Sequence, residues 1–157
     1  MKLRLFLILS SFLLLAACES YDCTLYNTVA LNCSFYKDGE RVTVDDTLTI
    51  TVGRNGPVLL NQSVWTSTLR LPLSYQQDED TLVFSIKGDG YFVRDTVWVA
   101  KTNQVHYESP DCPTKMFHSI QGARSTHMFI KDVTITKSSV DYETTENLQI
   151  HFLSASD

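Results

Sequence analysis

The chain has 157 residues, with 13 Lys or Arg against 18 Asp or Glu, so its net charge is −5 at pH 7. No cluster of basic residues is present to neutralise phosphates, which excludes a typical nucleic-acid partner. The length and the hydrophobic content of 43% suit one domain with a single core, which needs no metal or set of disulfides to fold.

Residues 1–17 have the pattern of a secretory signal peptide. Two basic residues precede an apolar run over 5–17, which falls short of the roughly 20 residues that span a bilayer as a helix. The run ends in Leu-Ala-Ala directly before Cys18, an arrangement similar to the bacterial lipobox, in which the cysteine receives a diacylglycerol. We therefore expect a lipid on Cys18 and a tether over 18–23. The alternative is a plain signal peptide that leaves Cys18 free to pair.

A lipidated Cys18 would make the membrane the first partner of the chain, because two or three acyl chains give lasting attachment where one does not. By similarity to sorting rules in two-membrane bacteria, Glu19 in place of Asp permits transfer to the outer membrane. The acidic Glu19 and Asp22 are compatible with either the periplasmic or the surface-facing leaflet. Removal of the leader takes two of the 13 basic residues away, which leaves 11 against 18 acidic residues and a net charge of −7.

Residues 24–157 alternate between apolar and polar positions with a period of two. In Leu48, Ile50 and Val52 the apolar side chains share one face, and threonines occupy the other, which predicts a half-buried strand. The pattern recurs at positions 69–73, 82–86, 97–99, 133–135 and 148–152, with turn signals between them. Seven to nine such strands in about this length predict an all-β, antiparallel immunoglobulin-like β-sandwich after the cleaved lipoprotein signal peptide, with a small barrel as the alternative.

Several phrases occur in a characteristic order: DTLTITV, VLLNQ, LRLPLSY, DTLVF, RDTVWV, ESPDC, MFH and VDYETTENLQIHF. In this order they resemble a family of small uncharacterised outer-membrane lipoproteins from Bacteroidota, over nearly the whole chain after the leader. The resemblance implies a β-sandwich fold and a place in the outer membrane. It implies no activity and no site residues.

Three threonines are candidates for O-glycosylation. Thr47, Thr81 and Thr96 each follow Asp and precede an apolar residue, which resembles the general O-glycosylation sequon of these bacteria. The alternative explanation is structural, because Asp commonly ends a turn and Thr commonly opens a strand.

Strand parity separates the three remaining cysteines. Cys33 shares a face with Leu31 and Phe35, so we expect it to be a buried, inert thiol. Cys23 and Cys112 lie in irregular flanks, where two segments can meet without interrupting a strand pair, and we predict a disulfide between them. The alternatives are that all three cysteines stay reduced or that Cys23 bridges two molecules.

No catalytic constellation, metal site or cofactor motif is recognisable, so we expect no enzyme activity and no cofactor. If Gly122 and Ala123 centre a two-residue hairpin, His118 and His127 lie opposite each other. Two histidines are still too few ligands for a metal site, and the sequence leaves their role open.

Trp65 lies among polar neighbours, and Trp98 is opposite in parity to Val97 and Val99, so we expect one or both to be exposed. An exposed Trp can stack on a sugar ring, which makes both residues candidates for glycan binding. Packing on the flank of the sandwich is the alternative. We therefore expect a non-enzymatic cell-envelope lipoprotein that acts as an interaction or structural module, with an envelope protein or a glycan as its partner. A glycan-binding surface module is the first alternative, and a metal-dependent enzyme is the second.

Overall fold

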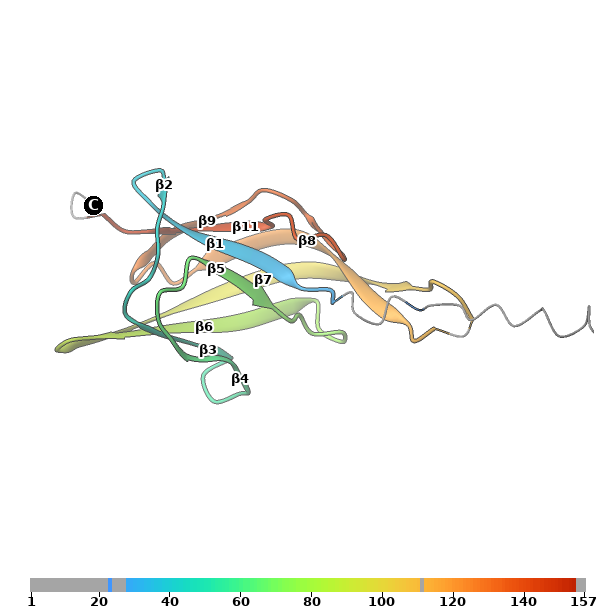
Figure 1. The fold of residues 1–157 in the computed structure, drawn as a ribbon, viewed down its shortest axis with the longest axis horizontal. Coiled ribbons are helices and arrows are strands. Elements are labelled where there is room, and N and C mark those ends of the chain that lie inside the picture. The colour runs from blue at the N-terminus through green and yellow to red at the C-terminus, as the bar shows by residue number, and fades with distance from the viewer. Residues whose placement is uncertain (1–22, 24–27, 111, 155–157) are drawn as a thin grey trace, which may run out of the picture.

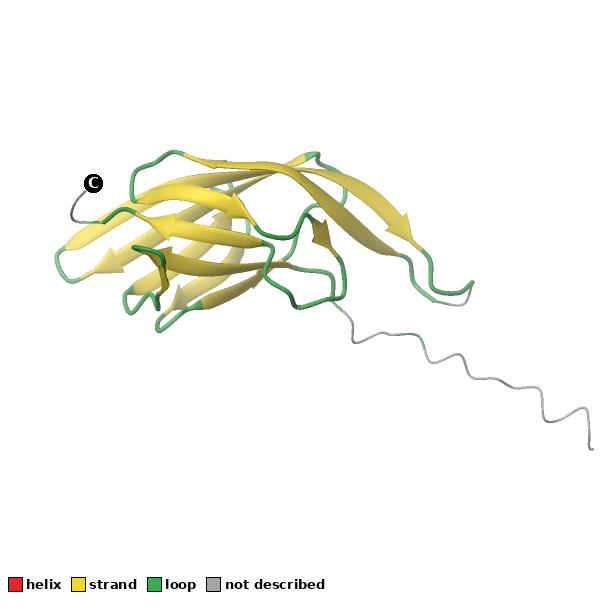
Figure 2. Cartoon of the chain, turned by 90° about the horizontal axis from the view of Figure 1, so that it is seen from above, coloured by secondary structure: helices red, strands yellow, loops and turns green. Residues whose placement is uncertain are grey.

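The computed structural model describes residues 23, 28–110 and 112–154. Within these ranges every regular element is a β-strand, and the strands form two sheets that pack in a sandwich-like arrangement (Figures 1 and 2). The all-β prediction is confirmed at this level. Eleven strands are present in the described residues, more than expected, because two of them contain only two residues each.

One sheet is built around β1, and we call it the β1 sheet. Its strands are β2 (Glu40–Arg41), β1 (Leu31–Lys37), β11 (Leu148–Phe152) and β9 (Ile130–Ile135) in spatial order, with β5 (Thr68–Leu71) pairing with β1 beside β2. The pair β1 and β11 is parallel, and all other pairs in the two sheets are antiparallel. The expectation of a purely antiparallel fold therefore fails at this one pair.

The other sheet, the β7 sheet, has the order β10 (Ser139–Val140), β8 (Lys115–Ser125), β7 (Tyr91–His106), β6 (Glu79–Gly88), β3 (Thr47–Val52) and β4 (Val58–Ser63). Strand β7 has 16 residues, and its later half pairs with β8 alone. The resulting β7–β8 hairpin reaches past the neighbouring strands at the end of the molecule where the described chain begins (Figure 1).

The core lies between the two sheets and follows the period of two in the sequence. Most of the apolar positions that the alternation selected are 0–8% exposed, among them Leu48, Ile50, Leu82, Phe84, Ile86, Val97, Val99, Leu148 and Ile150. The prediction is wrong at Ile135, which is 36% exposed, and Val52 and Phe152 are only partly buried. Cys33 also faces the core and is 2% exposed, as its parity predicted. Burial, together with the nearby Glu146 carboxylate, raises the pKa of Cys33, so this thiol stays protonated and inert.

Gly122 and Ala123 do not centre a hairpin, because β8 runs through them without a turn. Ala100 pairs with Gly122 and Lys101 pairs with Ile120, which leaves Gln121 as an extra residue in a β-bulge. A glycine within a strand often marks a bulge, and here that is its role. The turn that joins β7 to β8 lies earlier, between His106 and Lys115.

A disulfide joins Cys23 to Cys112, with the two Cα atoms 5.5 Å apart. It links the start of the described chain to the turn of the β7–β8 hairpin, 89 residues later. The pairing predicted from strand parity is therefore confirmed.

Candidate functional site

The outer face of the β7 sheet carries polar side chains in rows that cross several strands. Because side chains alternate along a strand, the residues between the core positions point away from the β1 sheet. The strand register defines one row of Thr49, Ser85 and Arg94 and a neighbouring row of Thr47, Lys87 and Phe92. Residues that are directly opposite in such rows have Cβ atoms about 4.5–5.5 Å apart, so each row is a continuous strip of neighbouring side chains.

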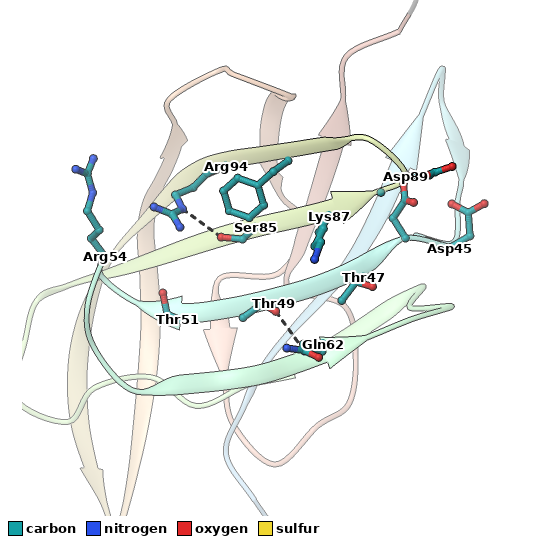
Figure 3. A pocket seen from close by; sticks show the side chains of 13 residues that line it. Asp45, Thr47, Thr49, Thr51, Arg54, Gln62, Ser85, Lys87, Asp89 and Arg94 are labelled. Carbon is teal, nitrogen blue, oxygen red and sulfur yellow. Dashed lines mark hydrogen bonds between the residues drawn. The ribbon is translucent and has the colours of Figure 1, made fainter.

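These rows line an open groove of about 600 Å³, which is the candidate functional site. Arg54, in the turn after β3, and Arg94 lie toward one end of the groove (Figure 3). Lys87 lies between them and the other end, where Asp45 and Asp89 are found. The groove therefore has a cationic end and an acidic end, with hydroxyl groups along its floor.

Arg94 is held in a defined position on the floor of the groove. Its guanidinium carbon lies 5.2 Å from the centre of the Phe92 ring, and its Nε donates a hydrogen bond of 3.3 Å to Ser85 Oγ. A guanidinium that is stacked on a ring and bonded through Nε still presents its Nη atoms, the pair that binds a carboxylate or phosphate in a fork. Phe92 itself is 57% exposed.

The acidic end is tied to the turn between β6 and β7. The Tyr91 hydroxyl donates a hydrogen bond to Asp46 Oδ2, and this bond raises the pKa of Tyr91. One acidic side chain of the groove therefore has a partner within the protein.

The three candidate O-glycosylation threonines all lie on the outer face of the β7 sheet, and Thr47 also lines the groove. The aspartates that precede Thr81 and Thr96 are buried, since Asp80 is 3% exposed and Asp95 is 1% exposed. Neither carboxylate is therefore presented to solvent in the folded domain. Both aspartates have structural roles, and glycosylation of the three threonines stays a prediction.

Asp95 holds the crossing from the β7 sheet to the β1 sheet. Its carboxylate accepts hydrogen bonds from the backbone N–H groups of Thr126, Met128, Phe129 and Ile130, three of them 2.8–2.9 Å long, and from the Thr126 hydroxyl. Burial opposes the charged form, but the bonds from the Thr126 hydroxyl and from the backbone outweigh it and lower the pKa of Asp95. The ionised carboxylate therefore fixes the turn after β8.

The two tryptophans lie apart from the groove, and neither lines it. Trp98 is on the same outer face, but the Arg124 guanidinium lies 4.6 Å from the centre of its ring and is in turn paired with Glu79 at 2.5 Å. Trp65 follows β4 and is 74% exposed, with a backbone φ of 55°. The aromatic side chain in the groove is Phe92, which sequence analysis missed.

A buried polar cluster lies near the base of the β7–β8 hairpin. Lys101 Nζ is 3.2 Å from Asp80 Oδ2, and it also donates to Ser74 O at 2.8 Å, to Gln77 O and to Asn103 Oδ1 at 3.1 Å. All hydrogens of this ammonium group are thus engaged. The cluster fixes the segment between β5 and β6 to the β7 sheet.

His118 and His127 are not neighbours across a hairpin, so the pairing considered from the sequence is wrong. His118 is 4% exposed and its Nδ1 lies 2.8 Å from Asn103 Oδ1. His127 is exposed in the turn after β8, where its Nδ1 is 2.8 Å from Lys131 O. Among the residues that the structure describes, no group of three His, Cys, Asp or Glu side chains is placed to hold a metal ion.

Cys18, the signal peptide over 1–17 and most of the tether lie outside the described residues. No helix long and apolar enough to cross a membrane occurs in ranges 28–110 and 112–154.

Comparison of the chain with known proteins shows the family to which it belongs. The structure defines a two-sheet, all-β domain with an open polar groove and a disulfide between Cys23 and Cys112. Residues 31–152 match a family of unknown function, DUF6452, and the chain belongs to this family. No curated protein and no solved structure matched the chain.

Four side chains of the groove were missed at the sequence level, namely Arg54, Lys87, Phe92 and Arg94. Phe92 and Arg94 are opposite in parity to Val97 and Val99, so the alternation alone would have placed them on the outer face. What the alternation does not give is which strands are neighbours. Only the register β3–β6–β7 brings these residues into one groove.

Proposed function

We propose that this protein is a non-enzymatic interaction module of the cell envelope, an immunoglobulin-like β-sandwich anchored to the outer membrane by a lipid on Cys18. The observation that carries the proposal is the open groove on the outer face of the β7 sheet, where exposed cations and hydroxyl groups converge. The lipid anchor is supported by the Leu-Ala-Ala-Cys sequence at its site. The immunoglobulin-like description is supported by two mainly antiparallel sheets between which the chain crosses repeatedly.

The position of the disulfide also supports a binding role for the groove. Cys112 lies at the end of β7 opposite to the turn after β6, and this turn borders the groove. Sixteen strand residues extend roughly 50 Å at about 3.3 Å each. A tether that leaves the domain at Cys23 would therefore hold the hairpin near the membrane and leave the groove at the distal end, where a partner can reach it.

A non-enzymatic role is supported by the buried ionisable groups. Lys101 and Asp95, whose side chains would be obvious candidates for chemistry, are surrounded by partners that fix turns and crossings of the fold. Such fully bonded groups have a structural role and offer no exposed reacting atom.

The anchor is tested by changing Cys18 to Ser in the full-length chain expressed in its own host. We expect the variant to leave the detergent phase and to appear in the soluble envelope fraction, with a mass that lacks the lipid. Unchanged membrane partition and unchanged mass would rule out the anchor.

The interaction role is tested by co-sedimentation of the soluble domain with washed envelope fragments. Lys87→Glu reverses a charge in the groove, and we expect it to reduce the bound fraction. Lys115→Glu makes the same change at the start of β8, outside the groove, and serves as the matched control. Equal binding of the two variants would contradict a role of the groove.

A glycan is the second candidate partner, and one observation favours it. The groove combines hydroxyl side chains in adjacent rows with an aromatic ring, Phe92, that is 57% exposed. Sugars are bound through hydrogen bonds to their hydroxyls and through contact of their apolar faces with aromatic rings. Trp65 and Trp98 stay candidates for stacking outside the groove, and loss of glycan binding in Trp65→Ala or Trp98→Ala would assign the role to them.

A further inference from the structure

Three cations of the groove have no carboxylate partner among the residues that the structure describes. Arg54, Lys87 and Arg94 are exposed, and no ion pair joins any of them to a carboxylate of the described residues. Outside the groove, Arg41, Lys101, Arg124 and Lys137 are paired with carboxylates, whereas Lys37 and Arg70, which lie far from one another in the sequence, are not paired within the described ranges. Three unpaired cations in one groove of an acidic protein indicate a ligand that carries negative charge.

The order of charges along the groove sets the orientation of such a ligand. Figure 3 shows Arg54 and Arg94 toward one end and Asp45 and Asp89 at the other. The acidic end repels an anion, whereas its carboxylates can accept hydrogen bonds from hydroxyl groups. A ligand with an anionic group and free hydroxyls therefore fits in one direction only.

Arg94 is the side chain that is prepared to bind the anionic group. Its stacking on Phe92 and its bond to Ser85 Oγ restrict the guanidinium before any ligand arrives. The entropy cost of ordering this side chain is thus already met in the free protein, and the Nη atoms are left for two parallel bonds to a carboxylate or sulfate.

We propose that the groove binds an acidic saccharide, with its carboxylate or sulfate on the Nη atoms of Arg94 and its hydroxyls on the side chains of Thr47, Thr49 and Ser85. Arg54 and Lys87 extend the cationic surface to the next charged units of the chain. This inference rests on the glycan-binding candidate and deepens it by naming the class of sugar.

The test uses the oxidised soluble domain with oligogalacturonate and with the same oligosaccharide as its full methyl ester, which has no charge. Binding is measured by calorimetry at low and at high salt. We expect the acid form to bind at least about tenfold more tightly than the ester, because only the acid form makes charge-assisted hydrogen bonds to the guanidinium of Arg94. Salt should weaken the acid form and leave the ester unchanged.

Variants of Arg94 identify the residue that binds the acid. Arg94→Gln should lose about tenfold in affinity for the acid, and Arg94→Lys should lose part of it, because lysine keeps the charge and lacks the fork. Arg124→Gln is the matched control, since Arg124 also stacks on an aromatic ring of the outer face but is already paired with Glu79. Its affinity should be unchanged, and near-ultraviolet spectra should show that all variants are folded.

Each remaining outcome decides a different point. Equal binding of acid and ester would overturn this inference and leave the glycan-binding candidate standing. Binding of neither sugar would overturn both. Acid binding that Arg94→Gln does not reduce would overturn the assignment of the groove.

Discussion

His118 makes the stability of the fold depend on pH in a window that its environment defines. Asn103 Oδ1 accepts a hydrogen bond from Lys101 Nζ at 3.1 Å, and Asn103 Nδ2 donates to Gln77 O at 3.1 Å, so the amide orientation is fixed. His118 Nδ1 lies 2.8 Å from this same Oδ1 and must therefore donate to it. This bond places a hydrogen on Nδ1, and the lowered pKa of His118 leaves the ring otherwise unprotonated near neutral pH.

Protonation of this ring is costly. Burial and then the positive charge of Lys101 lower the pKa of His118 from 6.5 to about 4, against a smaller opposing effect of Asp80. The folded-state pKa is depressed, so the unfolded chain binds the proton more readily, and stability is lost as pH falls from 6.5 toward 4. A shift of this size corresponds to about 3 kcal/mol at about 1.4 kcal/mol per pKa unit.

Urea unfolding of the oxidised domain from about pH 7.5 to about pH 4 measures this loss. Asp95 has a lowered pKa, so the stability that it contributes is lost only as pH falls below the ordinary range of a carboxyl group, at and beyond the acid end of this titration. His118→Gln removes the titrating group and keeps a donor for Asn103. We expect the stability advantage of the natural chain over His118→Gln to shrink by about 3 kcal/mol across the range.

The control is His127→Gln, because His127 is exposed in the turn after β8. The free energy of unfolding of His127→Gln should follow that of the natural chain at every pH. Parallel curves for the natural chain and His118→Gln would refute the reasoning, since they would show that His118 binds protons equally well in the folded and unfolded states.

Three further predictions concern the covalent and buried groups. Cys112→Ser should lower the free energy of unfolding by up to about 4–5 kcal/mol, because the disulfide joins two residues that are 89 positions apart and so restricts the unfolded chain. Calorimetry without reductant measures this loss, and an unchanged unfolding midpoint would show that the disulfide adds no stability. Iodoacetamide should label Cys33 only at the rate of unfolding, as read by mass spectrometry, whereas fast labelling would contradict its burial. Asp95→Asn should cost about 3 kcal/mol in urea unfolding, because it replaces the acceptor of several backbone N–H groups, while Asp132→Asn on the exposed side of β9 should cost little.

The sequence was sufficient for features that depend on the face of a strand. The alternation around Leu48, Phe84 and Val97 identified core positions, because a sheet buried on one side imposes a period of two. The same parity placed Cys33 inside, and it left Cys23 and Cys112 to pair. Each of these predictions needs only local pattern, so no knowledge of neighbouring strands was required.

Features that depend on pairing over long distances were missed. The sequence around Gly122 favours a turn, but the structure has a bulge in a continuous strand there, and glycine suits both. The same bulge changes the parity of β8, so His118 and Ile120 face inward before it and Ser125 faces inward after it. The groove around Arg94 depends on the register of β3, β6 and β7, and local propensity does not encode that register.

The disulfide also decides where tension enters the fold. A pull on the chain before Cys23 crosses directly to Cys112 and so reaches the β7–β8 hairpin, whose ladder joins ten residue pairs along the direction of the strands. With the bridge reduced, the same pull would arrive at β1, whose ladders to β5 and to β11 join four pairs each. In the oxidised protein the load therefore enters at a ladder of ten residue pairs, and the shorter ladders of β1 are reached only after it.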